Sequence, residues 1–378
     1  AAHPDRQGGV TRAGRSACAG LAALALGAGL AGCDAGAPCP TIVYAAGTTH
    51  SVSVAVAESL EAERREVEVR HVCYRLEAQP NYDLIDQPDA EVALAERIAS
   101  DPTVVAVVGH FRSRGSLAAA PVYARYGVPQ IVPGATSHLL RSAGPWTFVL
   151  APTDSEQAAF LADQAAVMRL RRVVVFYSAE PYGEGLAEAI RPMLAARRIA
   201  IEDEVRLGVG ADVATLAEAS TRARAVDGVI VLGDYGQAAT IAATVVARRP
   251  RLKLLASDGA MYPNGLRREG GAAAESLYVV SVWRPDTADS ATRRFITRFQ
   301  EVAGREATPG EALGADALLF ARAALDAVGP DRSAIRAWLA GPDGARPPPG
   351  HVTGATLHDG PPTSFQLIRI GPPPVSAP

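Results

Sequence analysis

Residues 104–116 read VVAVVGHFRSRGS, a run of valines and one alanine that ends in a glycine and is followed by a polar turn. A second apolar run, Val173–Phe176, leads in the same way toward the turn at 180–185. Parallel strands that are buried on both faces of a sheet have this continuous apolar character. The two runs therefore predict an α/β protein with parallel sheets, in which ligands bind at the turns beyond the carboxyl ends of the strands.

The rest of the body alternates further apolar runs with amphipathic stretches of helical length. Residues 153–156, Thr-Asp-Ser-Glu, have the spacing of a capping box and predict a helix that includes 158–170. Strands that alternate with helices predict βαβ crossovers, in which helices cover both faces of each sheet. The predicted strands are 41–46, 66–75, 104–109, 129–132, 147–150, 173–178, 228–233, 252–257 and 276–283.

Length and composition limit the possible functions. The chain has 378 residues, which suits two domains better than one, and its net charge is −3. A chain without net positive charge gives no reason to expect a nucleic-acid partner. The seven histidines and four cysteines do not have the spacing of a metal site, and no Gly-rich loop ends in Lys-Ser or Lys-Thr. We therefore expect no metal and no cofactor.

Residues 11–33, TRAGRSACAGLAALALGAGLAGC, have the layout of an export signal. Arg12 and Arg15 precede an apolar stretch that is too short to span a bilayer as a stable helix. The stretch ends in Leu30-Ala31-Gly32-Cys33, which resembles the lipobox of bacterial lipoproteins. In such a sequence the small residues let a peptidase reach the bond before the cysteine, and the cysteine thiol carries the lipid.

This layout predicts a lipoprotein signal peptide at 1–32, a lipidated Cys33 and a tether at 33–40. The alternative is an uncleaved anchor helix. In both cases the body of the protein is extracytoplasmic, and the lipid would anchor it to a bacterial membrane, in the periplasm or on the outer face of the cytoplasmic membrane.

Two cysteines, Cys39 and Cys73, remain beyond the signal. Cys39 precedes the predicted strand 41–46, whereas Cys73 comes late in the predicted strand 66–75. If these strands are parallel, the two cysteines lie about 20 Å apart at 3.3 Å per residue. We therefore expect them not to form a disulfide bond.

Five turns after predicted strands carry polar or glycine residues. In the turn at 109–116, Ser113 stands where a helix begins, so its hydroxyl and the amides there can bind a carboxylate; the alternative is an ordinary helix N-cap. In the turn at 133–138, carbonyl groups and the Thr136 hydroxyl can accept hydrogen bonds from an ammonium group. The remaining turns are 180–185 with Tyr182, 233–236 with Tyr235 and 257–260 with Asp258.

Three stretches resemble the leucine/isoleucine/valine-binding protein family of ABC importers, the type I periplasmic binding proteins. They are Val107–His110 with Ser113, Pro133–Thr136 and Tyr182–Leu186. The resemblance implies an α/β fold of two Rossmann-like lobes with parallel sheets, joined by a hinge of three crossovers. It implies that lobe 1 consists of 41–149 plus 283–344 and lobe 2 of 150–282 plus 345–378.

The resemblance also assigns roles to residues of the turns. By the family pattern, Ser113 binds the carboxylate of the ligand, whereas Gly134 and Thr136, with Ala135 between them, meet its ammonium group. Asp258 faces the same ammonium group.

Two tyrosines and one arginine complete the comparison with the family. By the same pattern, Tyr182 and Tyr235 pack on the ligand. Arg112 stands where some members have a cysteine, so the disulfide that they form there is absent, and Cys73 would be the partner left over.

These expectations describe a lipoprotein that binds a small molecule and is not an enzyme. A nucleophile elbow would need a glycine where Phe111 stands, two residues before Ser113. We expect a monomer that captures an amino acid, of the branched-chain type, between its lobes and presents it to an ABC permease. The alternatives are a ligand-sensing lipoprotein, or a binder of amides, urea or organic acids on the same fold.

Overall fold

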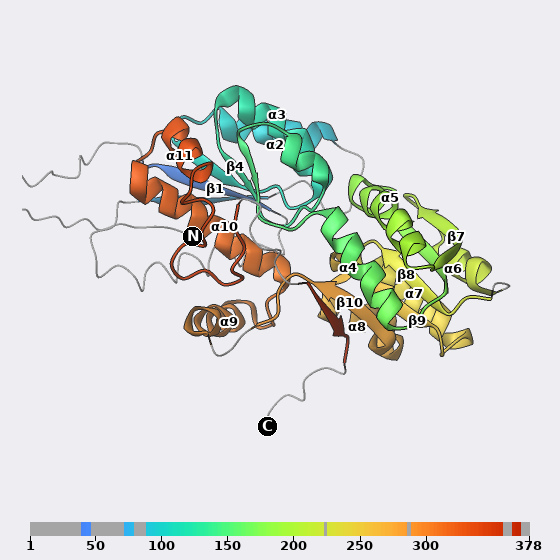
Figure 1. Cartoon of the computed structure of the whole chain (residues 1–378). Helices are drawn as coiled ribbons and strands as arrows, with labels where there is room; N and C mark the ends of the chain where they lie inside the picture. Colours follow the sequence, from blue (N-terminus) through green and yellow to red (C-terminus); the bar gives the residue numbers. More distant parts are fainter. Residues whose placement is uncertain are drawn as a thin grey trace, which may run out of the picture. The chain divides into compact units, whose positions relative to one another are not determined.

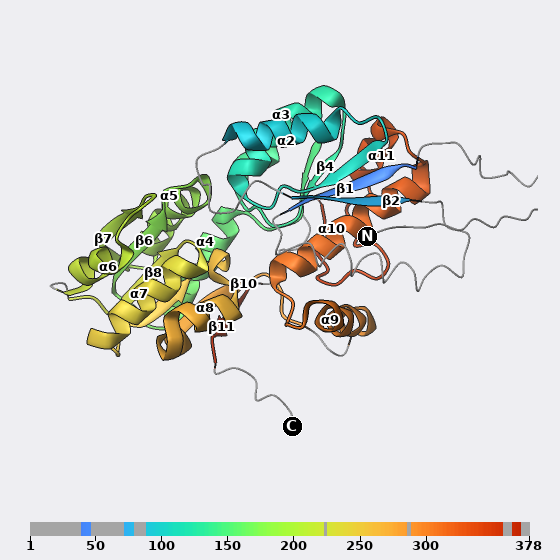
Figure 2. The same cartoon turned by 180° about the vertical axis from the view of Figure 1, so that it is seen from behind.

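The computed structural model describes residues 39–46, 72–78, 88–222, 225–285, 289–357 and 365–371. The chain divides into two units, Ala1–Pro38 and Cys39–Pro378. The predicted signal peptide and Cys33 fall outside the described residues, as does the 66–71 part of the second predicted strand. Figure 1 and Figure 2 show, from opposite sides, that the second unit contains two sheets with their helices.

The first sheet is parallel and has the strand order β2-β1-β3-β4-β5. Helices α2 and α3 cover one face, and α10 and α11 cover the other. The strands are β1 (Thr41–Ala46), β2 (Cys73–Ala78), β3 (Val104–Val108), β4 (Gln130–Val132) and β5 (Thr147–Val149). The helices are α2 (Pro88–Ala99), α3 (Ser113–Tyr126), the 3-10 helix η2 (His138–Ser142), α10 (Pro309–Val328) and α11 (Arg332–Leu339).

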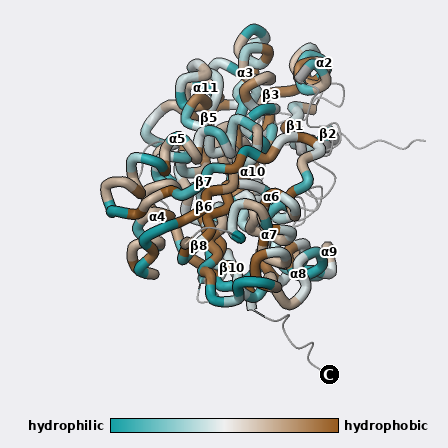
Figure 3. Tube along the Cα trace, turned by 90° about the vertical axis from the view of Figure 1, so that its right-hand side faces the viewer, coloured by the Kyte–Doolittle hydropathy of each residue, from teal (hydrophilic) through white to brown (hydrophobic). Residues whose placement is uncertain are grey.

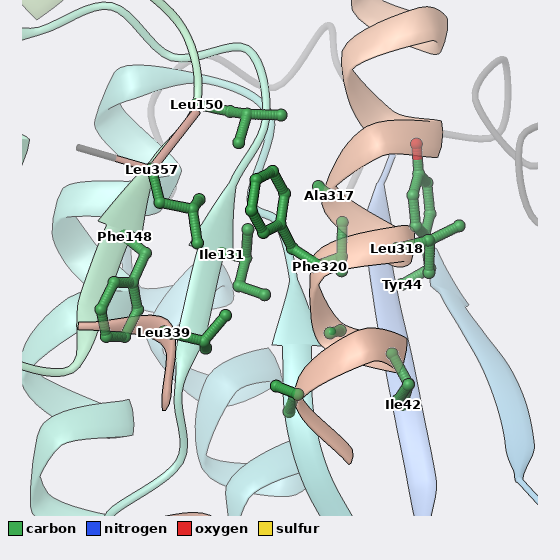
Figure 4. Close-up of a cluster of buried hydrophobic side chains, with 14 of the residues drawn as sticks. Ile42, Tyr44, Ile131, Phe148, Leu150, Ala317, Leu318, Phe320, Leu339 and Leu357 are labelled. Atoms are coloured by element: carbon green, nitrogen blue, oxygen red, sulfur yellow. The ribbon is translucent and has the colours of Figure 1, made fainter. Parts of the chain in front are cut away.

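The two faces of this sheet explain why its strands are apolar throughout. Successive side chains of a strand point to opposite faces. Ile42 and Tyr44 of β1 belong to the same core as Phe320 of α10, and Figure 4 shows this core. Val43 of β1 packs with Tyr123 of α3 on the opposite face. Each strand therefore contributes to two separate cores.

The second sheet has the order β11-β10-β9-β8-β6-β7, and it is parallel except for β11, which is antiparallel to β10. Helices α4 and α5 cover one face, and α6, α7 and α8 cover the other. Figure 3 shows hydrophobic stretches along β6 and β8. The strands are β6 (Arg172–Ser178), β7 (Ala200–Leu207), β8 (Gly228–Leu232), β9 (Lys253–Ala256), β10 (Leu277–Ser281) and β11 (Gln366–Arg369).

Three helices of the second sheet, α5, α7 and η3, begin at turns that the sequence singled out, and one further helix, α9, packs beside α10. The helices are α4 (Asp154–Val167), α5 (Pro181–Ala196), α6 (Val213–Arg222), α7 (Tyr235–Arg248), η3 (Asp258–Ala260), α8 (Pro263–Gly270) and η4 (Gly271–Ser276). α9 (Ser290–Ala303) packs on the start of α10, where Phe295 and Phe299 contact Ala312 and Ala315.

Most predicted strands are present with nearly the predicted bounds, and β1 has exactly the predicted range, 41–46. The strand β7 was not predicted, because its sequence AIEDEVRL alternates charged with apolar residues and lacks a continuous apolar run. That pattern suits its place at the edge of the sheet, where one side of the strand is unpaired.

Cys39 and Cys73 form a disulfide bond, with their Cα atoms 5.9 Å apart, so the expectation that they are unpaired was wrong. β1 and β2 are parallel, and Thr41 lies opposite Cys73. The error arose because β2 begins at Cys73, whereas the predicted strand placed this residue near its end. Both cysteines therefore lie at the amino ends of neighbouring strands, and Cys73 is not a partner left over by Arg112.

Candidate ligand-binding site

All five candidate turns lie at the carboxyl ends of strands, as predicted. Two of them follow β3 and β4 of the first sheet, and three follow β6, β8 and β9 of the second. In each sheet the strand order reverses direction at one point, between β1 and β3 in the first and between β6 and β8 in the second. Open α/β sheets bind ligands outside the carboxyl ends of strands at such a point.

Ser113 is the first residue of α3, and its hydroxyl is available to a ligand. The preceding residue, Arg112, is the N-cap and makes no side-chain capping bond. Ser113 is 4% exposed, and its Oγ has no hydrogen-bond partner among the described residues. Because an unpaired buried hydroxyl is costly, and because the N-terminus of a helix attracts anions, a carboxylate is the natural partner. The alternative role of Ser113 as an ordinary N-cap has no support in this geometry.

His110 holds the turn that carries Ser113. The imidazole is fully buried between two helices. Its Nδ1 lies 2.5 Å from Glu91 Oε2 of α2, and its Nε2 lies 3.1 Å from the Tyr123 hydroxyl of α3. The Ser116 hydroxyl donates a 2.7 Å hydrogen bond to the His110 carbonyl. These bonds fix the backbone immediately before Ser113 relative to both helices.

Thr136 of the second turn makes a direct contact with the start of α4. Its hydroxyl donates a 2.6 Å hydrogen bond to Asp154 Oδ1, and the Asp154 amide donates a 2.9 Å bond to the Thr136 carbonyl. Both side chains are at most 2% exposed. Gly134 lies against the Phe111 ring, and Ala135 is buried in a small cluster with Leu140. The turn is thus packed from both sides, with Thr136 held by α4.

Asp258 lies at the carboxyl end of β9, and uncharged donors hold its carboxylate. The Tyr182 hydroxyl donates to Oδ1 at 2.6 Å, and Gln157 Nε2 donates to the same oxygen at 2.8 Å. Gln157 Oε1 accepts from the Asp258 amide at 2.8 Å, and the Gly259 amide donates to the Tyr182 oxygen at 2.9 Å. Four residues from α4, α5 and η3 therefore form one connected network.

Burial governs the charge state of both carboxylates. It raises the pKa of Asp154 to about 7, the charge of Asp258 adds to this effect, and the bond from Thr136 opposes it. Burial also raises the pKa of Asp258, against the bonds from Tyr182 and Gln157. The pKa of Tyr182 is raised well above its usual value by burial and by Asp258, so its hydroxyl remains a donor. Two poorly solvated carboxylates that repel each other favour a cationic ligand group.

The two turns nearest to Ser113 and Tyr182 are joined by an ion pair. Nη1 of Arg112 lies 3.6 Å from Oε2 of Glu180. Arg112 precedes Ser113, and Glu180 is the N-cap residue of α5, two residues before Tyr182. The turns after β3 and β6 are therefore neighbours, although they belong to different sheets.

Tyr235 is placed differently from the other predicted site residues. Its ring packs edge-on against Tyr262, with the ring centroids 5.1 Å apart, and both rings lie close to Gly265 of α8. It belongs to the core on the α7 face of the second sheet, whereas Tyr182 packs on the α5 face. The turn before it is held by Asp234, which caps α7. The described contacts do not bring Tyr235 into the network around Asp258.

Sequence reasoning missed Asp154 and Gln157. Asp154 lies within the capping-box stretch 153–156, and Gln157 follows it directly. The capping box itself is confirmed, because Thr153 accepts a bond from the Glu156 amide. The capping-box pattern explains the start of α4 but does not indicate that Asp154 and Gln157 bond to Thr136 and Asp258. The available signal was the 154/157 spacing, because residues three apart lie on one face of a helix.

The described residues contain no group of three or more His, Cys, Asp or Glu side chains that could hold a metal ion. None of the helices described is both long and apolar enough to cross a membrane.

The chain is similar to known binding proteins in sequence and in fold. Residues 81–355 match a family model described as periplasmic binding protein. A protein of Pseudomonas aeruginosa named amino acid binding protein is 33% identical over 110 residues, which is 29% of each chain. The matched stretches thus cover under a third of the length of the curated relatives.

Solved structures match over most of the chain. The branched-chain amino acid transporter substrate-binding protein LivJ of Streptococcus pneumoniae, in complex with isoleucine, has a TM-score of 0.75 at 17% identity, covering 85% of this chain and 92% of that one. A solute-binding protein of a Rhodopseudomonas palustris ABC transporter, in complex with 4-hydroxybenzoate, has a TM-score of 0.70 at 13% identity, covering 80% and 84%. At these identities the likeness concerns the fold, which is that of type I periplasmic binding proteins.

Proposed function

Because the chain belongs to the periplasmic binding protein family, we propose that it is a solute-binding lipoprotein that captures an amino acid, preferably a branched-chain one, for an ABC importer. Members of this family are binding proteins and not enzymes, and the family implies an extracytoplasmic location. The observation that carries the choice of an amino acid is Asp258, a carboxylate whose partners among the described residues are all uncharged donors.

The two ends of an α-amino acid match the two kinds of group in the turns. The carboxylate binds the Ser113 hydroxyl and the amides at the start of α3. The buried Ser113 oxygen has no hydrogen-bond partner in the part of the chain that the structure describes. The ammonium group binds the Gly134 carbonyl, the Thr136 hydroxyl and Asp258, with Ala135 forming the adjoining wall. An ammonium group beside Asp258 supplies the positive charge that this buried carboxylate lacks.

The side chain of the ligand is recognised by the remaining surface. Tyr182 offers the face of its ring while its hydroxyl holds Asp258. Tyr235 also contacts the ligand side chain in this proposal. Its ring packs on Tyr262, so this contact requires a shift of α7 and α8. The leucine/isoleucine/valine preference is supported by the neighbour that holds isoleucine.

An aromatic acid is the main alternative ligand, because a neighbour of the same fold holds 4-hydroxybenzoate. Such a ligand has a carboxylate for Ser113 but no cation for Asp258. The charge of Asp258 would then remain uncompensated, which is costly for a buried group. Amides and urea share this defect, so the amino acid is favoured.

We propose that capture proceeds by hinge closure between lobe 1 (41–149 and 283–344) and lobe 2 (150–282 and 345–378), and that the closed form is presented to an ABC permease. The bond from Thr136 to Asp154 and the ion pair of Arg112 with Glu180 support this proposal, because each joins residues of different lobes.

Ala355 and Leu357 pack in the core of the first sheet, beside α10, so we infer that residues 345–357 belong to lobe 1 and not, as the family pattern implied, to lobe 2. The C-terminal part of lobe 2 then includes β11, which starts at Gln366.

The lipid anchor at Cys33 and the monomeric state belong to the same proposal. The Cys39–Cys73 disulfide supports an oxidising, extracytoplasmic compartment, since such bonds are rare in the cytosol. A ligand-sensing lipoprotein is the second candidate, and the same site would serve it.

A thermal-shift screen of the purified chain tests the ligand class. A ligand at 100 times its dissociation constant adds about 2.7 kcal/mol to the free energy of unfolding. We expect leucine, isoleucine or valine to raise the melting temperature. A shift with 4-hydroxybenzoate or urea, and none with amino acids, would replace the amino acid by that alternative.

A further inference from the structure

Asp154 is buried beside the candidate site, and its role there is not set by the binding scheme above. Its side chain is 1% exposed, Oδ1 accepts from Thr136, and Oδ2 has no hydrogen-bond partner among the described residues. A Cβ built on Gly185 of α5 would lie 2.8 Å from Oδ2. Helix α5 therefore approaches this oxygen closely, and the glycine is what leaves room for it.

The bond between Thr136 and Asp154 sets the direction in which Thr136 can act. A hydroxyl has one proton, and that of Thr136 is donated to Asp154 Oδ1 at 2.6 Å. Its remaining lone pairs can then only accept hydrogen bonds. Thr136 is thereby prepared for an N–H donor, such as an ammonium group, and not for a carboxylate or a carbonyl.

The charged surroundings of Asp154 show what an arriving cation would change. Among the groups that act on the pKa of Asp154, the charged one is Asp258, and it raises that pKa. Glu184 of α5 pairs with Arg206, and Arg191 with Glu204. The titratable groups of α4, α5, the 133–138 turn and η3 are Glu156, Asp163, His138, Tyr182, Glu184, Glu188, Arg191 and Asp258. Two carboxylates with no cation between them retain a proton more readily than one.

We propose that Asp154 is a positioning residue for the amino group of the ligand, and that binding of a cationic amino group releases a proton from Asp154 to the solvent. The inference rests on the proposed function. In the free protein, burial and Asp258 keep Asp154 partly protonated near neutral pH. The ammonium group, which arrives with its own proton, favours the ionised form of both carboxylates. The proton leaves Asp154, and the bond from Thr136 to Oδ1 becomes charge-assisted.

Ligand affinity should depend on pH through Asp154. The pKa of Asp154 in the free protein is about 7, and the bound ligand lowers it. Affinity is therefore greatest above pH 7 and falls as the pH decreases, by at most about tenfold per pH unit for one released proton. The loss stops once the pH drops below the pKa of the bound form.

Isothermal titration calorimetry with L-isoleucine tests this on the full chain. At pH 7, heats measured in phosphate and in Tris differ when protons are released, because the two buffers have different ionisation enthalpies. We expect release of a fraction of a proton at pH 7 and a clearly smaller release at pH 8, where most of Asp154 is already ionised in the free protein. Asp154→Asn should bind about tenfold more weakly at pH 8, with no buffer dependence and a flat pH profile. Its melting temperature at pH 7 shows whether the variant is folded.

Asp163→Asn is the matched control, because Asp163 lies on the same helix and is an exposed residue paired with Arg197. It should release protons as the natural chain does. Proton release that persists in Asp154→Asn would assign the proton to Asp258 and overturn the inference. Isoleucine binding that is independent of pH between 5.5 and 8.5 would also overturn it, while leaving the proposed function intact. If isoleucine does not bind at any pH, both fall.

Discussion

The hydroxyl of Tyr182 donates a 2.6 Å hydrogen bond to the carboxylate of Asp258, although the two residues are 76 positions apart in the chain. Tyr182 is the second residue of α5, which follows β6, and Asp258 is the first residue of η3, which follows β9. The bond exists because both strands end at the same edge of one parallel sheet. It determines where the negative charge of the site is held, so its removal should be felt by a cationic ligand.

Tyr182→Phe keeps the ring but removes this bond. A hydrogen bond to a charged group is worth about 1.5–3 kcal/mol, so its loss should lower the free energy of unfolding by about that amount. Isoleucine affinity should fall as well, because Asp258 is no longer held in place. Tyr278→Phe, on β10, is the matched control and should bind as the natural chain does. Calorimetry measures both, and equal affinities would mean that the Tyr182 hydroxyl does not support ligand binding.

Ser113→Ala and Ser116→Ala should have opposite effects, although the two buried serines lie three residues apart. Ser113 has an unpaired hydroxyl, so its removal should leave the free energy of unfolding unchanged or raise it, while isoleucine affinity falls at least about tenfold. Ser116 donates to the His110 carbonyl, so its loss should cost about 1 kcal/mol of stability. Denaturant unfolding with and without isoleucine separates the two. Unchanged affinity in Ser113→Ala would reduce this residue to a structural one.

Reduction of the Cys39–Cys73 bond should destabilise the protein. The cysteines are 34 residues apart, and the chain-entropy estimate for a loop of that length is about 3–4 kcal/mol. Urea unfolding of the natural chain, with and without a reducing agent, measures the difference. Cys39→Ser, which should show no effect of the reductant, is the control.

The stability of the ligand-free protein should depend on pH through Asp154. Its folded pKa is raised to about 7 from 3.8, so between these values the folded state holds more protons than the unfolded one. Stability from this group therefore increases as the pH falls from 7 toward 4, and is lost as the pH rises through 7. Asp154→Asn removes the cost of ionising this buried carboxyl group. The substitution should therefore stabilise the free protein at pH 8 more than at pH 5. Thermal unfolding at both pH values checks this, and an equal effect at both would contradict the raised pKa.

Sequence patterns were sufficient where one local rule decides the structure. Val104–Val108 is buried on both faces, and its apolar run revealed both the strand and the turn after it. Ser113 and Asp258 could be named because each follows such a strand. The capping box at Thr153 was likewise decided by residues within one helical turn.

The structural features that the sequence did not predict depend on contacts between distant segments of the chain. The disulfide depended on the residue at which β2 begins, which a few residues of apolar character do not determine. Asp154 became a site residue through the packing of the Thr136 turn and of Gly185 against α4. Tyr235 was predicted to contact the ligand, and this stays a prediction. The packing of its ring on Tyr262, 27 positions later in the chain, could not be read from the residues around it.

If Asp258 and Asp154 select a cationic amino group, two ligands that differ only in that group should bind with very different affinities. L-Isoleucine and 3-methylpentanoic acid share the carboxylate and the branched side chain, and differ in the ammonium group. Calorimetry at pH 8 should show isoleucine binding at least about a hundredfold tighter, since an unpaired buried charge costs about 3–5 kcal/mol. In Asp258→Asn, this preference should shrink by most of its value. Equal binding of the two acids by the natural chain would contradict the account.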